Sequence, residues 1–213
     1  MTGTTKDTKH AKDTKRNLPP GWRWVRLGEV CEQDRKIVDP KSEQAMYLPY
    51  LGLENIESQT GRILRSAIAN PSNEGISSTF AFDARHVLYG KLRPYLNKVA
   101  LPDFSGRCTT EIIPLLPSSG LDKEYLCWLL RRTDTVAVAM RDVTGSRMPR
   151  ADMSAILKHE IPLPPLPEQQ RIAAILKEQM AAVDKARAAA EAELAAINAL
   201  PAALLRRAFN GKL

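Results

Sequence analysis

Cationic and amide side chains gather in a short segment around Pro94. Residues 91–98 carry three cations, an amide and a phenol, namely Lys91, Arg93, Tyr95, Asn97 and Lys98. A proline-containing turn with such groups suits contacts with the phosphates of a nucleic acid and entry into a groove. The alternative is that Leu92, Tyr95 and Leu96 pack the turn while Lys91 and Lys98 are solvated.

A second polar segment, residues 144–150, is small, is interrupted by Gly145 and contains Ser146, Arg147 and Arg150. Arginine guanidinium groups can clamp a phosphate or make two parallel hydrogen bonds to guanine. We therefore include these three residues among the candidate contacts. The alternative is that the segment only connects two helices.

A third polar segment, residues 70–78, supplies the amides of Asn70 and Asn73 together with several serine hydroxyls. Amide and hydroxyl groups can form hydrogen bonds with the edges of bases. Asn70 and Asn73 are therefore candidates too, and the alternative is a plain surface loop.

Motifs for catalysis are missing from the sequence. It contains no G-x-x-x-x-G-K-[ST] phosphate loop, no G-x-G-x-x-G after a strand and no H-E-x-x-H. The string Asn70-Pro71-Ser72-Asn73 lacks the second proline and the aromatic residue of an amine methyltransferase site. We therefore predict a chain that is not an enzyme, with no metal or cofactor of its own. The rival is an enzyme whose site is not recognised.

The three cysteines, Cys31, Cys108 and Cys127, are widely spaced and include no C-x-x-C pair. This pattern supports neither a disulfide framework nor a zinc site and fits a reducing cytoplasm. The chain also lacks a secretory apolar region and a run of about 18 apolar residues. We expect a cytoplasmic protein with no membrane segment.

The formal charge of +7 is spread along the chain. Residues 1–17 carry +3 and have nothing apolar to bury, so we predict a disordered basic tail. The residues from Pro167 onward carry +2, which leaves +2 for the part between. Such a charge is compatible with nucleic acid but does not establish it.

The middle of the chain, residues 18–160, predicts one globular α+β domain, because short strands are followed by helices in a separate block. The expected strands are 47–53, 61–67, 79–82, 86–89, 98–101 and 111–115. The expected helices are 121–132, with Asp122 as N-cap, 134–141 and 151–157.

A proline-rich connector, residues 161–167, predicts a short polyproline-like spacer that leads into a long helix over 168–213. Pro167 suits the first helical turn, and Asn210-Gly211 supplies a stop after Phe209. The helix would be about 60 Å long. Pro201 is expected to kink it or to end its first section.

An apolar stripe follows this helix at a spacing that requires a partner helix. Its members are Ile172, Leu176, Met180, Val183, Ala190, Leu194, Ile197 and Leu204. The alternative is that the stripe packs on the protein's own globular domain, which is too short to cover a helix of this length.

Five segments together resemble the specificity subunit of type I restriction-modification systems. They are LPPGW with VRLGEV at 18–22 and 25–30, YGKLRPYLNKV at 89–99, GRCTTE at 106–111, PLPPLPEQQ at 162–170 and LLRRAFNGKL at 204–213. The resemblance covers nearly all of residues 18–213. It implies a target recognition domain that binds double-stranded DNA, followed by a conserved helix.

The resemblance also has a consequence for assembly. Full-length members carry two recognition domains and two helices, whereas this chain has one of each, so it is similar to a half-subunit. A homodimer with an antiparallel coiled coil would restore the layout and give a bipartite, palindromic target. A truncated gene product or a fragment is the alternative. A further rival is a stand-alone or restriction-interfering half-subunit that competes for the methyltransferase.

Partner subunits would supply the chemistry that the family performs. By resemblance, a DNA methyltransferase subunit brings S-adenosylmethionine, and a restriction and translocation subunit brings ATP and Mg²⁺. The candidate docking segments are 162–170 and 204–213.

Overall fold

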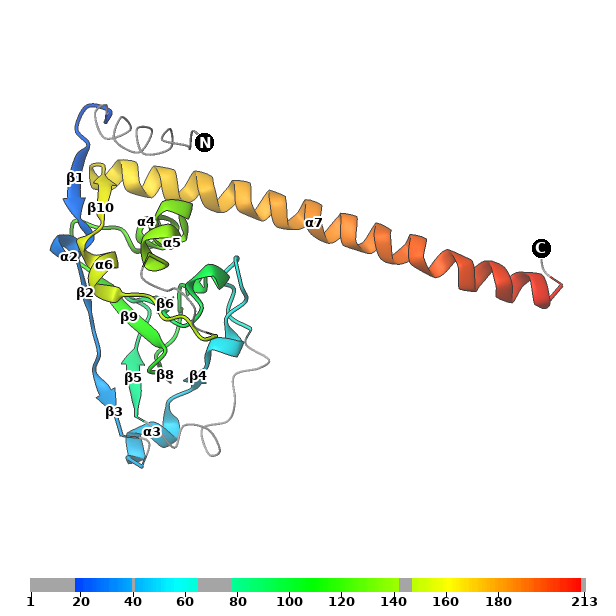
Figure 1. Ribbon diagram of the computed structural model, residues 1–213, viewed down its shortest axis with the longest axis horizontal. Coiled ribbons are helices and arrows are strands. Elements are labelled where there is room, and N and C mark those ends of the chain that lie inside the picture. The colour runs from blue at the N-terminus through cyan, green and yellow to red at the C-terminus, as the bar shows by residue number, and fades with distance from the viewer. Residues whose placement is uncertain (1–17, 40, 65–77, 142–146, 212–213) are drawn as a thin grey trace, which may run out of the picture. The chain divides into compact units, whose positions relative to one another are not determined.

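The structure is a computed structural model that describes residues 18–39, 41–64, 78–141 and 147–211 (Figure 1). The chain divides into two compact units, Met1–Gln170 and Arg171–Leu213. The first unit combines short strands with short helices, and one long helix begins in it and makes up the second. The predicted α+β class with a long C-terminal helix is confirmed. The predicted tail, residues 1–17, lies outside the described residues.

Two four-stranded sheets form the centre of the first unit. One is antiparallel throughout, in the order β2-β9-β6-β7, and the other, β3-β5-β8-β4, has one parallel pair, β4 with β8. The first sheet consists of β2 Cys31–Gln33, β6 Val87–Gly90, β7 Val99–Ala100 and β9 Ile112–Pro117. The second consists of β3 Ile37–Val38, β4 Tyr50–Leu51, β5 Thr79–Phe82 and β8 Gly106–Thr109.

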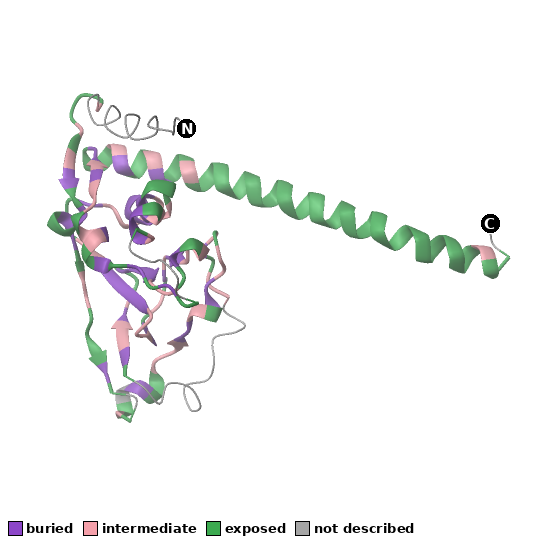
Figure 2. Ribbon diagram, in the orientation of Figure 1, coloured by how far each residue is buried: buried purple, intermediate pink, exposed green. Residues whose placement is uncertain are grey.

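Both sheets supply apolar side chains to one core, and buried residues lie along strands of the first unit (Figure 2). Its buried members are Leu51, Ile56, Phe82, Leu88, Ala100, Cys108 and Ile112. The expected strand at 79–82 is confirmed, and the one at 86–89 is shifted by one residue. The strand expected over 61–67 is wrong in its described part, 61–64, where only an isolated bridge joins Ile63 to Ile56.

The helices of the first unit are short. They are α2 Leu27–Val30, α3 Glu43–Tyr47, α4 Lys123–Arg131, α5 Thr133–Ala139 and α6 Met153–Lys158, with the 3-10 turns η1 Leu53–Asn55 and η3 Pro94–Leu96. The Asp122 carboxylate accepts a hydrogen bond from the Tyr125 amide, which confirms Asp122 as the N-cap of α4. The strand expected at 47–53 is wrong over most of its length, because α3 and η1 leave only β4 between them.

The proline-rich connector is part of a sheet. Strand β10, Glu160–Leu163, pairs antiparallel with β1, Arg23–Arg26, so that Trp24 lies opposite Pro162. The expectation of a free polyproline spacer is therefore wrong for these residues. Because β10 pairs with a strand on one side only, Pro162 fits in it despite its missing N–H.

Helix α7, Leu166–Phe209, is 44 residues long and continues through Pro201. The expectation that Pro201 ends a first section is wrong. The helix does stop after Phe209, where Gly211 adopts a φ of 64°. An 18-residue window of α7 reaches a mean hydropathy of 1.3, so by length and composition this helix could cross a membrane. The averaged hydropathy thus detects a candidate that a search for unbroken apolar runs missed.

Gln169 fastens the first turn of α7 to its surroundings in the first unit. Its fully buried side chain accepts a hydrogen bond from the Asp122 amide and donates two, to the carbonyls of Gly120 and Pro164. One amide group therefore satisfies backbone groups just before α4 and in the middle of the connector. Gln170, the next residue, is exposed.

We predict that Gln169→Ala lowers the free energy of unfolding by about 2–4 kcal/mol, because it leaves buried backbone groups without partners. Gln170→Ala is the matched control and should stay within about 0.5 kcal/mol of the unaltered chain. Urea denaturation followed by circular dichroism measures both. Equal stabilities of the two variants would contradict this role of Gln169.

Candidate nucleic-acid interface

The segment 91–98 forms a rigid tip between β6 and β7. Arg93 and Asn97, at the two ends of η3, adopt left-handed conformations with φ of 52° and 51°. Gln59 holds the tip through two hydrogen bonds of 3.0 Å. Its backbone amide donates to the Leu96 carbonyl, and its side-chain amide donates to the Tyr95 carbonyl. The backbone of this tip is therefore fixed before any ligand binds.

The segment 147–151 lies against this tip, although the two are far apart in the sequence. The Arg93 amide donates to the Pro149 carbonyl at 2.7 Å, and the Ala151 amide donates to the Lys91 carbonyl at 2.8 Å. An isolated bridge also pairs Leu92 with Arg150. Two of the three predicted polar segments thus form one surface, which we call the tip surface (residues 91–98 and 147–150). Residues 142–146, which include Ser146, lie outside the described residues, as do Asn70 and Asn73.

Two predicted contact residues turn toward the protein. The Lys98 ammonium donates to the Leu53 carbonyl at 2.7 Å, and burial lowers the pKa of this lysine although Glu54 acts in the opposite direction. The Asn97 amide donates to the Arg131 carbonyl at 3.0 Å. These polar groups hold the tip in place, so the alternative of a solvated Lys98 is wrong. Contacts of Lys98 and Asn97 with DNA stay a prediction.

Helix α4 supports the tip through Arg131. Its guanidinium donates to the carbonyls of Val99, at 2.6 Å, and Thr60, and it lies over the Trp128 ring at 5.1 Å from the centroid. Arg131 therefore supports the end of the tip twice, through its guanidinium at Val99 and through its carbonyl, which accepts the bond from Asn97.

Three predicted contact residues point outward: Arg93, Tyr95 and Arg147 are exposed, and Arg150 is exposed as well but is paired with a carboxylate. Tyr95 is 48% exposed, so the alternative in which it packs the turn is wrong. Met148, beside Arg147, is exposed to the same degree. The tip surface thus combines free cations with an aromatic and an apolar side chain, a mixture that suits phosphate and base contacts.

Glu111 neutralises part of the charge beside the tip. Its carboxylate accepts hydrogen bonds from Arg150 at 2.8–3.1 Å and lies 3.8 Å from the Lys91 ammonium. This hydrogen-bonded pair raises the pKa of Arg150 above its ordinary value. Lys91 and Arg150 are therefore oriented by a carboxylate, whereas the three outward residues are not paired with one in the described residues.

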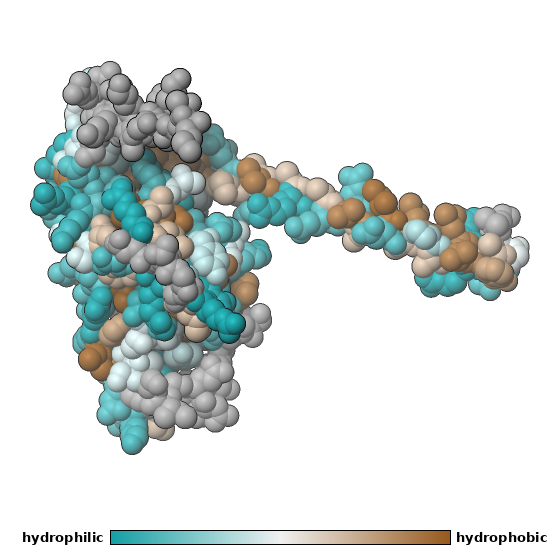
Figure 3. Space-filling model, viewed as in Figure 1, coloured by the Kyte–Doolittle hydropathy of each residue, from teal (hydrophilic) through white to brown (hydrophobic). Residues whose placement is uncertain are grey.

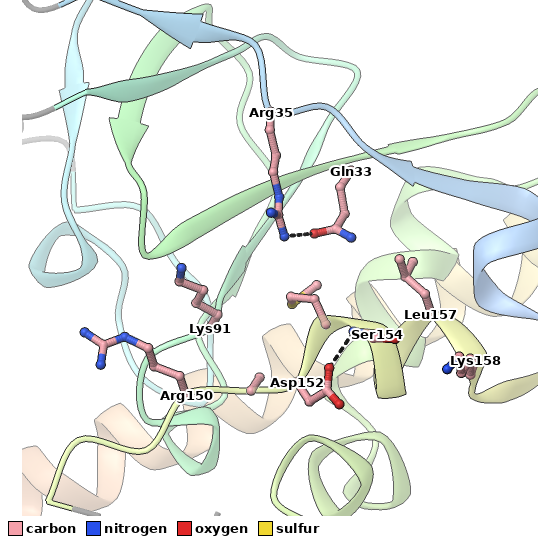
Figure 4. A pocket seen from close by; sticks show the side chains of 10 residues that line it. Gln33, Arg35, Lys91, Arg150, Asp152, Ser154, Leu157 and Lys158 are labelled. Carbon is pink, nitrogen blue, oxygen red and sulfur yellow. Dashed lines mark hydrogen bonds between the residues drawn. The ribbon is translucent and has the colours of Figure 1, made fainter. Parts of the chain in front are cut away.

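A cleft of about 580 Å³ opens beside the tip surface (Figure 4). Besides Lys91 and Arg150, two cations that sequence reasoning missed, Arg35 and Lys158, line this cleft. Neither belongs to a recognisable motif, and they are brought together only by the packing of residues 33–35 and α6 around the tip. No signal in the sequence could have found them.

Helix α7 carries the predicted stripe on an exposed surface (Figure 3). Met180, Val183, Leu194, Ile197 and Leu204 are 38–58% exposed, Ala190 is also exposed, and Ile172 and Leu176 are half-buried. The pairing of this stripe as a coiled coil stays a prediction.

Groups suited to nucleophilic or metal chemistry do not converge in the described residues. Burial raises the pKa of Cys31 and Cys108 to about 12 and that of Cys127 to about 11, so these thiols are poor nucleophiles. Across the described ranges, no three His, Cys, Asp or Glu side chains are placed to hold a metal ion. What the described surface offers is a set of cations suited to binding an anionic ligand.

Comparison with known proteins identifies the relatives of this chain. The model of the family described as type I restriction modification DNA specificity domain matches residues 19–193. The type I restriction enzyme EcoDI specificity subunit of Escherichia coli is 28% identical over 199 residues, or 92% of this chain and 43% of that protein.

Solved structures give the same result. The HsdS subunit from Thermoanaerobacter tengcongensis is 30% identical, with a TM-score of 0.66, over 80% of this chain and 44% of that one. A structure that describes complex assembly and conformational transition of the type I R-M system is 26% identical, with a TM-score of 0.62, over 96% of this chain and 54% of that one. The chain spans about half the length of these relatives.

The inward direction of Lys98 leads to a stability prediction. Lys98→Ala should lower the free energy of unfolding by about 1–2 kcal/mol, because it removes the hydrogen bond to Leu53. Lys91→Ala, at the other end of the tip, should change it by less than about 0.5 kcal/mol. Thermal unfolding of the two variants checks this, and a larger loss for Lys91→Ala would refute the assignment.

Proposed function

The chain belongs to the type I restriction modification DNA specificity domain family, and on this basis we propose that it selects the DNA target of a type I restriction-modification complex. Members of this family recognise DNA and are not themselves catalytic. The chain would direct a methyltransferase subunit, and with it a restriction subunit, to that target. We place this activity in the cytoplasm.

The observation that carries the proposal is the tip surface. Arg93, Tyr95 and Arg147 are exposed on a backbone that is already fixed by the bonds of Gln59 and Pro149. A preorganised tip loses little entropy when it meets DNA, so more of the contact energy remains for binding. Positioning by phosphate contacts and reading by base contacts can both come from such a surface.

The target would be bipartite, because we propose that two copies pair through α7. The exposed stripe repeats every seven residues from Val183 to Leu204 through Ala190 and Ile197, as a helix–helix seam requires. A membrane is a poorer partner for this helix. Its apolar stretch 188–205 includes Glu191 and Glu193, and charged side chains are unfavourable inside a membrane helix.

Cofactors would reach the complex on other subunits. We propose that the methyltransferase subunit holds S-adenosylmethionine and that the restriction subunit holds ATP and Mg²⁺. The ends of α7, within 162–170 and 204–211, are the proposed docking segments. Both are structurally suited to this role, because the first is anchored by Gln169 and the second ends in an exposed helix.

The direct test combines the chain with a type I methyltransferase subunit, S-adenosylmethionine and genomic DNA. We predict new methylated sites with one bipartite, palindromic sequence, read by methylation-sensitive sequencing. Each protein alone should leave the DNA unmodified. Loss of methylation at the sites of an added full-length specificity subunit, without new sites, would instead identify a competitor of the methyltransferase.

Pairing through α7 is tested by charge on the stripe. Val183→Asp combined with Ile197→Asp should convert a dimer to a monomer in sedimentation, because two carboxylates would be buried in an apolar seam. The control is Ala192→Asp with Ala199→Asp, which lie on the opposite side of the helix and should leave the dimer intact. If the Val183→Asp, Ile197→Asp variant sediments with the same mass as the unaltered dimer, this seam is excluded.

A further inference from the structure

The cleft beside the tip surface has the composition of an anion site. Arg35, Lys91, Arg150 and Lys158 supply four cations, and Asp152 is the carboxylate among its lining residues (Figure 4). The Asp152 carboxylate accepts a hydrogen bond from the Ser154 amide at 2.8 Å and thus caps α6. Glu111, which pairs with Lys91 and Arg150, is a further carboxylate beside the cleft. The cleft therefore has an excess of positive charge.

Arg35 is held at the cleft by backbone bonds on both sides of it. The Asp34 amide donates to the Pro114 carbonyl at 2.9 Å, and the Ala81 amide donates to the Lys36 carbonyl at 2.8 Å. The Asp34 carboxylate also lies 3.2 Å from the ring of His86, a buried histidine. The Arg35 guanidinium meets only a neutral partner among the described contacts, the side-chain oxygen of Gln33.

The ion pair of Arg150 with Glu111 lies on the surface, within reach of solvent. The Arg150 side chain is 53% exposed, and solvent screens an ion pair at such a site, so the pair contributes little to stability. A phosphodiester offers the same planar pairing to a guanidinium and is attracted by Arg35 and Lys91 as well. Glu111 thus orients Arg150 and Lys91 without binding them tightly.

We propose that this cleft binds one backbone phosphate of double-stranded DNA, with Arg35, Lys91 and Lys158 as its cations, and that the phosphate replaces Glu111 as the partner of Arg150. The inference rests on the proposed function and adds to it a place for the DNA backbone. Because the cleft and the tip surface share Lys91 and Arg150, a phosphate in the cleft sets the register of the base pairs that meet Arg93 and Tyr95.

The test measures binding of the full chain to a duplex of about 30 base pairs by fluorescence anisotropy over a series of salt concentrations. Arg35→Gln should weaken binding and flatten the plot of log K against log salt by up to about 0.9, the value for complete loss of one phosphate contact. Arg35→Lys keeps the charge and should retain the slope of the unaltered chain. Arg23→Gln, an exposed cation on β1 outside the cleft, is the control.

Glu111→Gln provides a test in the opposite direction. It should raise the affinity about two- to fivefold, the range expected when a surface ion pair is released. Glu57→Gln, which breaks the exposed pair with Arg62 outside the cleft, should leave the affinity unchanged. A lower affinity for Glu111→Gln would overturn the exchange, and thermal unfolding verifies that each variant is folded.

An Arg93→Gln variant separates failure of this inference from failure of the proposed function. If Arg93→Gln weakens binding while the Arg35 and Glu111 variants match their controls, the cleft is overturned and the DNA-binding function stands. If the unaltered chain binds no duplex at any salt concentration, both fail. If the cleft variants lose a protein partner while their DNA binding is unchanged, the cleft is a protein-docking site and the phosphate proposal is wrong.

Discussion

The first unit depends on one buried amide, the side chain of Gln169. Its three hydrogen bonds join the Asp122 amide and the carbonyls of Gly120 and Pro164, which lie just before α4 and within the proline-rich connector. A buried backbone group without a partner costs about 1–3 kcal/mol, so a side chain that satisfies three of them acts as a structural joint. The pairing of β1 with β10 closes the same region, because it brings the first strand against the residues that precede α7.

The tip surface shows how strain and hydrogen bonding are balanced at the proposed recognition site. Left-handed conformations at residues other than glycine cost about 1–3 kcal/mol each, and Arg93 and Asn97 both adopt one. Hydrogen bonds offset that cost and hold η3 in this arrangement. Gln59 donates to the tip, the Arg93 amide donates to Pro149, and the Asn97 side chain donates to Arg131. Cations of one short segment are thereby divided between two tasks. Lys98 stabilises the fold, whereas Arg93 remains exposed.

The two units suit different kinds of interaction. The first carries exposed cations on segments supported by the sheets and by α4, which suits an anionic ligand. The second presents an apolar stripe on a helix, which favours another helix. Since the chain spans about half the length of its relatives, the proposed dimer would bring two recognition units together through the exposed stripe of α7.

Local signals in the sequence were sufficient for several features. The caps Asp122 and Gly211, the seven-residue stripe and the α+β order of elements all depend on neighbouring residues, and the structure has these features. Strand pairing, the direction of each cation and the cleft were decided by tertiary structure. Arg23 meets Leu163, and Arg35 and Lys158 line one cleft, through contacts between distant segments. Packing decides whether a lysine such as Lys98 faces water or a carbonyl. The residue type cannot decide this, because it is the same in both cases.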